Sequence, residues 1–468
     1  MAGFFDQVSS GSMDAQEVNE LQKALSAGYG TDSANFTGGR ALIPENLESE
    51  TLNVVAQLKE DCKVMNSVKK TPVRSTVHEV NLRTSHGEYR HLSVAEGGAS
   101  VDTDQQLERK PFAMKYLQTR RSVTKQMEAA ETFEGALASE KLSGVETIIK
   151  GAEYQCFHGD SSIVPTEFDG FIASIKKANA ADQNIIDLKG ATIGSYGEKI
   201  FDEIAAKVRK NGGFIDKALF PTVLAKDIKE LFESKQRYIM NQALPNLSFK
   251  TIPDYGTAVG ANIALSGEEA GDDLFYEVKG EVVAEGDSTR RPAAPTSVTA
   301  AASADANSKF DSGDAGDYMY TVHAVNQYGI SAGTSIAAAV TVAKGDKVTL
   351  TITPGSGVRA TGYIICRSKK DETVVMEMDK VADSGNATTT YADLNTELPG
   401  TASMLFLPKK RFQPVYTFAQ LLPVCTFPLA AVNSAETPFL VMMYGGLEVR
   451  AAKQCGLVKN ISYSGGLY

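Results

Sequence analysis

The sequence predicts an α+β protein interrupted by an all-β insertion, and three observations support this fold class. Apolar residues recur at helical spacing through residues 127–157. Helix-like and strand-like segments then alternate through 168–236, which is typical of a layered domain containing a sheet. Residues 291–400 change abruptly to short strand-like runs rich in Thr, Val, Ala, Ser and Gly. Because the earlier composition returns after Gly400, we interpret 291–400 as an insertion.

Length and composition indicate a globular chain of two or three domains, since 468 residues exceed one ordinary core. The net charge is −10, whereas a specific nucleic-acid binder usually carries a basic surplus that neutralises phosphates. The five cysteines contain no C-x-x-C pair, so we expect free thiols and no structural zinc. With no signal peptide and no apolar run near the ~20 residues that span a bilayer, we expect a cytoplasmic protein.

The first 126 residues show no core of their own. Residues 1–60 are predicted to be an arm, with a short amphipathic helix at 14–26 and a Gly-, Ser- and Thr-rich stretch at 28–40. Residues 61–126 are predicted to form a long hairpin from strands at 71–84 and 112–124. In each strand, side chains at alternate positions are predicted to share one face. They are Thr76, His78, Val80 and Leu82 in the first strand, and Phe112, Met114 and Tyr116 in the second. Such a hairpin cannot bury both faces alone, so we expect a neighbouring subunit to cover it.

Residues 127–290 are predicted to hold a long helix and most of an α/β domain. The helix would run about 45 Å over 127–157 and end at Gly159. Further helices are expected at 197–209 and 222–238, with a strand at 217–220 between them. Residues 401–468 contain two apolar strand-like runs and complete this domain.

The insertion, 291–400, shows about seven short strands, the pattern of an immunoglobulin-like sandwich. Because the chain has no Trp and no Cys…Trp…Cys pattern, we expect a domain closer to fibronectin type III.

Candidate chemical motifs are weak, and we predict no catalytic, cofactor-binding or metal-binding residues. His86 and His91 are five residues apart, not the four that would align two ligands on a helix. The FHGDSS segment, 157–162, resembles a helix stop more than a catalytic triad, whose members come from separate elements. The acidic run 268–273 lacks the alternation of a calcium loop; a solvated turn is expected there, with weak cation binding as the alternative. Scattered basic clusters favour ion pairs or solvated edges over nucleic-acid binding: Lys69-Lys70, Arg120-Arg121, Arg290-Arg291 and Lys409-Lys410-Arg411.

The order of predicted elements resembles that of tailed-bacteriophage major capsid proteins, whose fold also forms herpesvirus capsid floors and encapsulins. FHGD at 157–160, followed by EFDGFIASI at 167–175, is similar to the stretch where the long spine helix of these proteins leads into their next domain. Further similarity points to the large Twort-like myophages, in this order along the chain: GYG at 28–30, STV at 75–77, HG at 86–87, AMKY at 113–116, QLLPVCTFPLAAVN at 420–433 and MMYGGLEVRAAKQCGLVKNISY at 442–463.

This resemblance implies a capsid fold with an N-terminal arm, an extended hairpin loop, a spine helix, and peripheral and axial domains. It implies a virion protein, made in the host cytoplasm, that forms hexamers and pentamers in an icosahedral head around double-stranded DNA. Its implied partners are a portal protein, a scaffold and decoration proteins. In related phages a leading segment is removed by a protease, which makes the helix at 14–26 a candidate assembly element.

One departure from the family concerns covalent cross-linking. Some proteins of this fold join subunits through a hairpin lysine and an asparagine, but the expected tip here, 86–94, contains no lysine. We therefore expect no cross-links. Two other classes stay open: an encapsulin-like compartment, which would enclose a cargo enzyme, and an adhesin module, which would rest on 291–400 alone.

Overall fold

The computed structural model describes residues 62–100, 102–130, 135–178, 180, 183–233, 254–260, 262–265, 279–408, 414–431 and 434–464. Four sequence-based expectations lie outside these residues: the helix at 14–26, the stretch at 28–40, the acidic run at 268–273 and the basic cluster at 409–411. Within the described part of the chain, no helix is long and apolar enough to cross a membrane.

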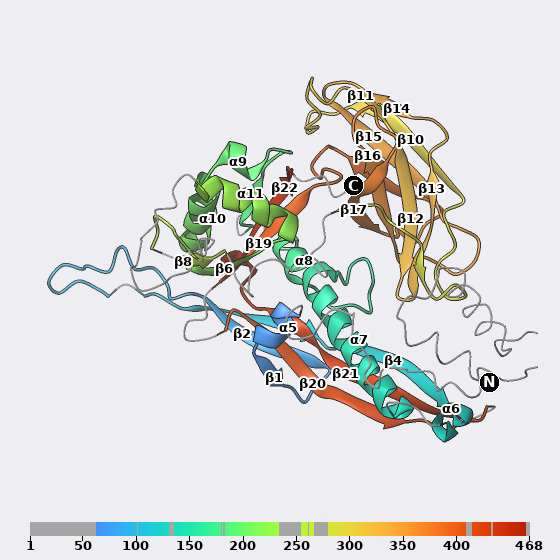
Figure 1. Cartoon of the computed structure of the whole chain (residues 1–468). Coiled ribbons are helices and arrows are strands. Elements are labelled where there is room, and N and C mark those ends of the chain that lie inside the picture. The colour runs from blue at the N-terminus through green and yellow to red at the C-terminus, as the bar shows by residue number, and fades with distance from the viewer. Residues whose placement is uncertain are drawn as a thin grey trace, which may run out of the picture. The chain divides into compact units, whose positions relative to one another are not determined.

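A four-stranded sheet and a long helix form the first layer (Figure 1). The strand order is β1 (Lys70–Pro72), β20 (Tyr416–Pro428), β21 (Glu436–Val449), β4 (Lys115–Thr124). Helix α7 (Ala136–His158) packs on this sheet so closely that a Cβ at Gly144 would lie 2.8 Å from Val441. The helix predicted for 127–157 is thus correct over most of its length. Its start is wrong, because α6 (Lys125–Ala129) ends in the extended residue Ala130.

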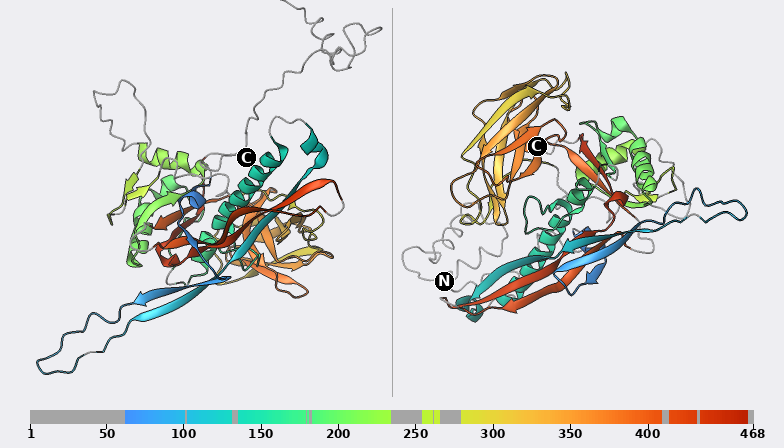
Figure 2. Two further views of the ribbon diagram at one scale, coloured as in Figure 1. Left: turned by 90° about the horizontal axis from the view of Figure 1, so that it is seen from below. Right: turned by 180° about the vertical axis from the view of Figure 1, so that it is seen from behind.

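The predicted hairpin is present, but with a different second strand. Strand β2 (Val77–Ser85) pairs antiparallel with β3 (Gln106–Ala113), and His78, Val80 and Leu82 share the half-buried face as predicted. The return strand expected at 112–124 is wrong, because most of it is β4, which pairs with β21. The inward phase reverses at buried Met114, leaving Tyr116 54 % exposed, because the chain changes sheets there. Figure 2 shows both hairpin strands extending away from the four-stranded sheet.

A six-stranded sheet forms the core of the α/β layer. Its order is β5 (Ile185–Asp187), β22 (Gly456–Ile461), β19 (Ala402–Pro408), β6 (Ile215–Leu219), β8 (Asn262–Ala264), β7 (Asp254–Gly256). The helices of this layer are α8 (Phe171–Lys176), α9 (Ile193–Tyr196), α10 (Lys199–Lys210) and α11 (Thr222–Glu233). The predicted apolar face of α10 is buried: Ile200, Phe201, Ile204 and Val208. Strands β19 and β22 lie inside this sheet, so residues after the insertion complete the layer that residues before it begin.

Two antiparallel sheets enclose a separate core in the insertion. One contains β10 (Ser297–Ala304), β15 (Asp346–Thr353) and β18 (Thr389–Asp393). The other contains β17 (Val375–Ala382), β16 (Gly362–Ser368), β12 (Tyr320–Asn326), β13 (Gly329–Ser335) and β9 (Glu285–Gly286). Strands β11 (Gly316–Tyr318) and β14 (Val340–Val342) extend the hairpin of β12 and β13. Buried side chains from both sheets, including Val322, Leu350 and Ile365, form one cluster, so this unit buries its own apolar faces.

Candidate functional site

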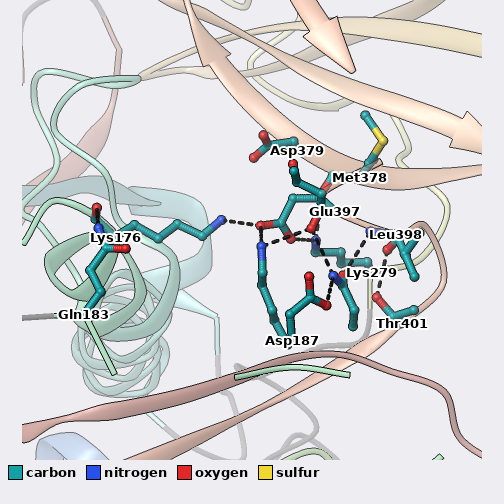
Figure 3. Close-up of polar contacts among 12 residues, drawn as sticks. Lys176, Gln183, Asp187, Lys279, Met378, Asp379, Glu397, Leu398 and Thr401 are labelled. Atoms are coloured by element: carbon teal, nitrogen blue, oxygen red, sulfur yellow. Dashed lines mark hydrogen bonds and ion pairs between the residues drawn. The ribbon is translucent and has the colours of Figure 1, made fainter. Parts of the chain in front are cut away.

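An ionic cluster with a buried centre lies where the insertion returns to the α/β layer. The carboxylate of Glu397, whose side chain is 7 % exposed, faces three ammonium groups: Lys279 at 2.7 Å, Lys459 at 2.9 Å and Lys176 at 3.2 Å. Figure 3 shows Glu397 with Lys279 and Lys176. We call these four residues the Glu397 junction. They come from four separate segments: the end of α8, the connector before β9, the connector after β18, and β22.

The electrostatics of the Glu397 junction favour a charged carboxylate. Burial acts to raise the pKa of Glu397, but Lys279, Lys176 and Lys459 outweigh it and hold that pKa well below its usual range. Lys279 also donates to the carbonyl oxygen of Met378, and Lys459 to that of Thr396. The cluster is therefore a satisfied structural ion network and has no group poised for proton transfer.

A second set of contacts lies beside the junction. Asp187 of β5 faces Lys309 of the insertion at 3.5 Å and accepts a hydrogen bond of 2.7 Å from the side-chain amide of Asn460. Asn460 has a left-handed backbone (φ 58°), and its side-chain oxygen accepts from the amide of Leu398 at 3.0 Å. This residue thus connects β5 with the connector that follows β18.

A cavity of about 800 Å³ adjoins the junction, lined by side chains of α7, α8, β17 and β22. The wall includes charged groups that pair with each other, such as Lys380 and Glu377 at 3.6 Å. In the part of the chain that the structure describes, no group of three or more His, Cys, Asp or Glu side chains is placed to hold a metal ion. The described wall of the cavity therefore contains apolar side chains and ion pairs.

The segment singled out as FHGDSS ends the spine helix. Gly159 and Gly170 lie against each other, with the Gly170 amide donating to the Gly159 carbonyl at 2.9 Å. A Cβ at either glycine would collide with backbone carbonyl oxygens at 2.4–2.8 Å. Lys177 bridges Asp160 and Asp169, at 2.7 Å from each. The two glycines therefore allow the chain to form a compact turn over 157–170, because only glycine permits such close approach of the backbone.

The other sequence candidates lie apart from the junction. His86 and His91 are both exposed in the connection between β2 and β3. Arg120 and Arg121 form ion pairs within the chain, with Glu436 at 2.8 Å and Glu140 at 3.0 Å. All five cysteines are free thiols, and four of them are buried.

The hairpin base contains a buried carboxylate that sequence reasoning missed. Glu448 of β21 is fully buried and bonds to His78 of β2 at 2.5 Å and to Thr417 at 3.2 Å. Lys110 of β3 donates to the carbonyl of Val449 at 3.1 Å. The available signal was a single acidic residue in the otherwise apolar run MMYGGLEV, which predicts a buried partner. Glu153 of α7 is a second buried carboxylate that the sequence analysis did not identify. It accepts hydrogen bonds from the amides of Val64 and Met65 at the start of α5 (Lys63–Ser67).

Similarity to known proteins extends over nearly the whole chain. A protein of Enterococcus phage phiEF24C that carries the name major capsid protein is 27 % identical over 95 % of both chains. The major capsid protein of Staphylococcus phage K is 25 % identical over 96 % of both chains. The capsid of a native GTA particle matches with a TM-score of 0.47 and 9 % identity, covering 91 % of this chain and 97 % of that one. No protein-family model matches the chain.

These relatives match nearly the full length of this chain, which has a projecting hairpin, a spine helix on a sheet and an α/β layer. The chain is a tailed-phage major capsid protein, a structural subunit of the shell of a phage head.

Proposed function

We propose that the subunit assembles into hexamers and pentamers that close an icosahedral head around double-stranded DNA, which it encloses without sequence-specific contacts. The proposed partners of this shell are a portal protein and a scaffold, with decoration proteins as an optional addition. The observation that carries this proposal is the hairpin, whose apolar side chains remain exposed in the single chain. They are Tyr89 at 74 %, Leu92 at 53 %, Val94 at 49 % and Leu107 at 61 %. Exposed apolar groups on a projecting element favour burial against another subunit.

We also propose a role in the shell for each segment of the chain. Residues 1–60 act as an arm, and 77–113 act as the projecting hairpin, while the remainder of 61–126 belongs to the shell wall. Residues 127–290 and 401–468 together form the spine, peripheral and axial parts of the shell wall. Residues 291–400 form an immunoglobulin-like module on the outer surface, because packaged DNA would crowd a module on the inside.

The strand order of the module supports a sandwich of the immunoglobulin-like kind with altered connections. In an immunoglobulin constant-type domain the first two strands lie in one sheet. Here β10 and β12, its first two long strands, lie in different sheets, and β15 pairs with both β10 and β18. We therefore propose shared architecture with a different order of strands.

Shell formation is directly testable with the purified full chain. We expect electron microscopy and sedimentation velocity to show capsomers or closed shells, with scaffold supplied if needed. On a reducing denaturing gel, the protein from those shells should run as a single band of one subunit, because the hairpin tip has no lysine for a cross-link. A compact monomer at all concentrations would contradict the proposal, and a ladder of subunit multiples would contradict the absence of cross-links.

Replacement of the module tests whether shell closure needs it. Residues 292–393 would be exchanged for a short Gly/Ser linker, which retains Glu397 and the junction. Because the module buries its own core, we expect shells of normal diameter by electron microscopy. A longer replacement, 292–399, serves as the comparison, since it removes Glu397 and leaves three lysines together. Loss of assembly with the shorter replacement, despite folded subunits, would show that the module carries essential contacts.

A further inference from the structure

We propose that the Glu397 junction holds the inserted module in one fixed orientation on the α/β layer, so that the module is displayed rigidly and not as a hinged appendage. The observation behind this proposal is that both connectors of the module are tied at one point. Lys279 precedes β9, the first strand of the module's sheets, Glu397 follows β18, the last one, and the two side chains bind each other at 2.7 Å.

The connectors themselves would permit motion. Residues 279–284 contain no strand or helix, and 394–401 likewise have no regular ladder. Segments with few backbone hydrogen bonds open at low free-energy cost, so such connectors would act as a hinge if nothing else restrained them. The backbone supplies only a few restraints, such as the hydrogen bond from the Lys279 amide to the Thr401 carbonyl at 3.4 Å, so a fixed orientation on the layer needs side-chain contacts as well.

Glu397 supplies two such contacts to the α/β layer. Lys176 fixes it to the end of α8, and Lys459 fixes it to β22 in the six-stranded sheet. Two other contacts restrain the module: Lys309 of the module faces Asp187 of β5, and a Cβ at Gly362 of β16 would lie 2.6 Å from Ile163 in the turn between α7 and α8. These contacts restrain the module from more than one direction, which is what a fixed orientation requires.

The carboxylate is the indispensable member of the junction. Removing it would leave three ammonium groups close together, on side chains that are 17 %, 27 % and 41 % exposed, with no carboxylate to offset their mutual repulsion. Removing one lysine leaves two others to neutralise Glu397. The effect of a substitution should consequently be larger for Glu397 than for Lys176, whose side chain is 41 % exposed.

The pH range of the junction follows from the same charges. A carboxylate with a lowered pKa contributes stability above its unfolded pKa and loses it as pH falls through the folded pKa. The groups facing it are Lys176, Lys279 and Lys459, with Asp187 of β5 and Asp379 of β17 nearby. Orientation should therefore stay constant from mildly acidic to neutral pH and weaken only in strong acid.

The test compares Glu397→Gln with Glu372→Gln, an exposed position on the module, in the full chain. Hydrogen exchange at the amide of Leu398, which donates to Asn460, should accelerate roughly tenfold or more in Glu397→Gln and stay unchanged in the control. Exchange at Leu350, in the core of the module, should not change. In assembled shells, cryo-electron microscopy should show the module density blurred relative to the shell wall.

Two further variants keep the proposal falsifiable. Lys459→Gln added to Glu397→Gln should partly restore slow exchange at Leu398, because it removes one of the repelling charges. If Glu397→Gln does not fold, Lys176→Gln takes its place. It should accelerate hydrogen exchange at Leu398 by less than the roughly tenfold change expected for Glu397→Gln. Unchanged exchange at Leu398 and equally sharp module density in every variant that folds would overturn the proposal. Shell assembly of Glu397→Gln with a blurred module separates this result from the proposed shell function.

Discussion

Removing the apolar side chains of the hairpin tip is expected to abolish shell formation while the subunit stays folded. The triple change Tyr89→Ser, Leu92→Ser and Val94→Ser affects exposed groups that contact no core cluster. Burying an apolar side chain of this size contributes about 1.5–3 kcal/mol, and a closed shell repeats each contact in every subunit. Sedimentation velocity should therefore show subunits or small capsomers in place of shells.

The control for this experiment is Val283→Ser, which removes a 72 % exposed apolar side chain from the connector before β9. It should assemble normally. Thermal unfolding of the triple variant should match the unmodified subunit, because the anchor at the hairpin base, His78 with Glu448, is untouched. Closed shells of normal diameter from the triple variant would show that the tip is not part of an essential interface.

The substitution Gly170→Ala should destabilise the subunit by about 3 kcal/mol. Its Cβ would lie 2.6, 2.7 and 2.8 Å from the carbonyl oxygens of Gln155, Cys156 and Phe157. These oxygens belong to the last turn of α7, so they cannot move without unwinding the end of the spine helix. The midpoint of urea unfolding should fall accordingly, with an unchanged dependence on urea concentration.

The matched control is Gly151→Ala in the same helix. A Cβ there meets nothing within 4 Å, and alanine is favoured over glycine in a helix interior by about 1 kcal/mol. This variant should be slightly more stable than the unmodified chain. Equal stability of Gly170→Ala and the unmodified protein would mean that the turn at 157–170 adjusts without cost, contrary to the role assigned to its glycines.

Local patterns in the sequence determined the elements whose signals depend on near neighbours. The apolar face of α10, the strand character of β20 and β21, and the change of composition at the module follow from spacing and residue type alone. The resemblance of FHGD and EFDG to capsid proteins likewise depends on contiguous residues. Close backbone approach explains that motif physically, since Gly159 and Gly170 each have room only for hydrogen.

Only the tertiary structure decided which segments pair. The sequence predicted β4 as the return strand of the hairpin, but it pairs with β21. Alternation of apolar and polar residues indicates which face of a strand is buried, but it does not indicate which strand lies beside it. The order of strands in the module was beyond reach for the same reason. The Glu397 junction joins Lys279, Lys459 and Lys176 from separate parts of the chain. A glutamate in a polar connector has no local feature that marks it as buried; its burial arises only when folding brings three lysines around it.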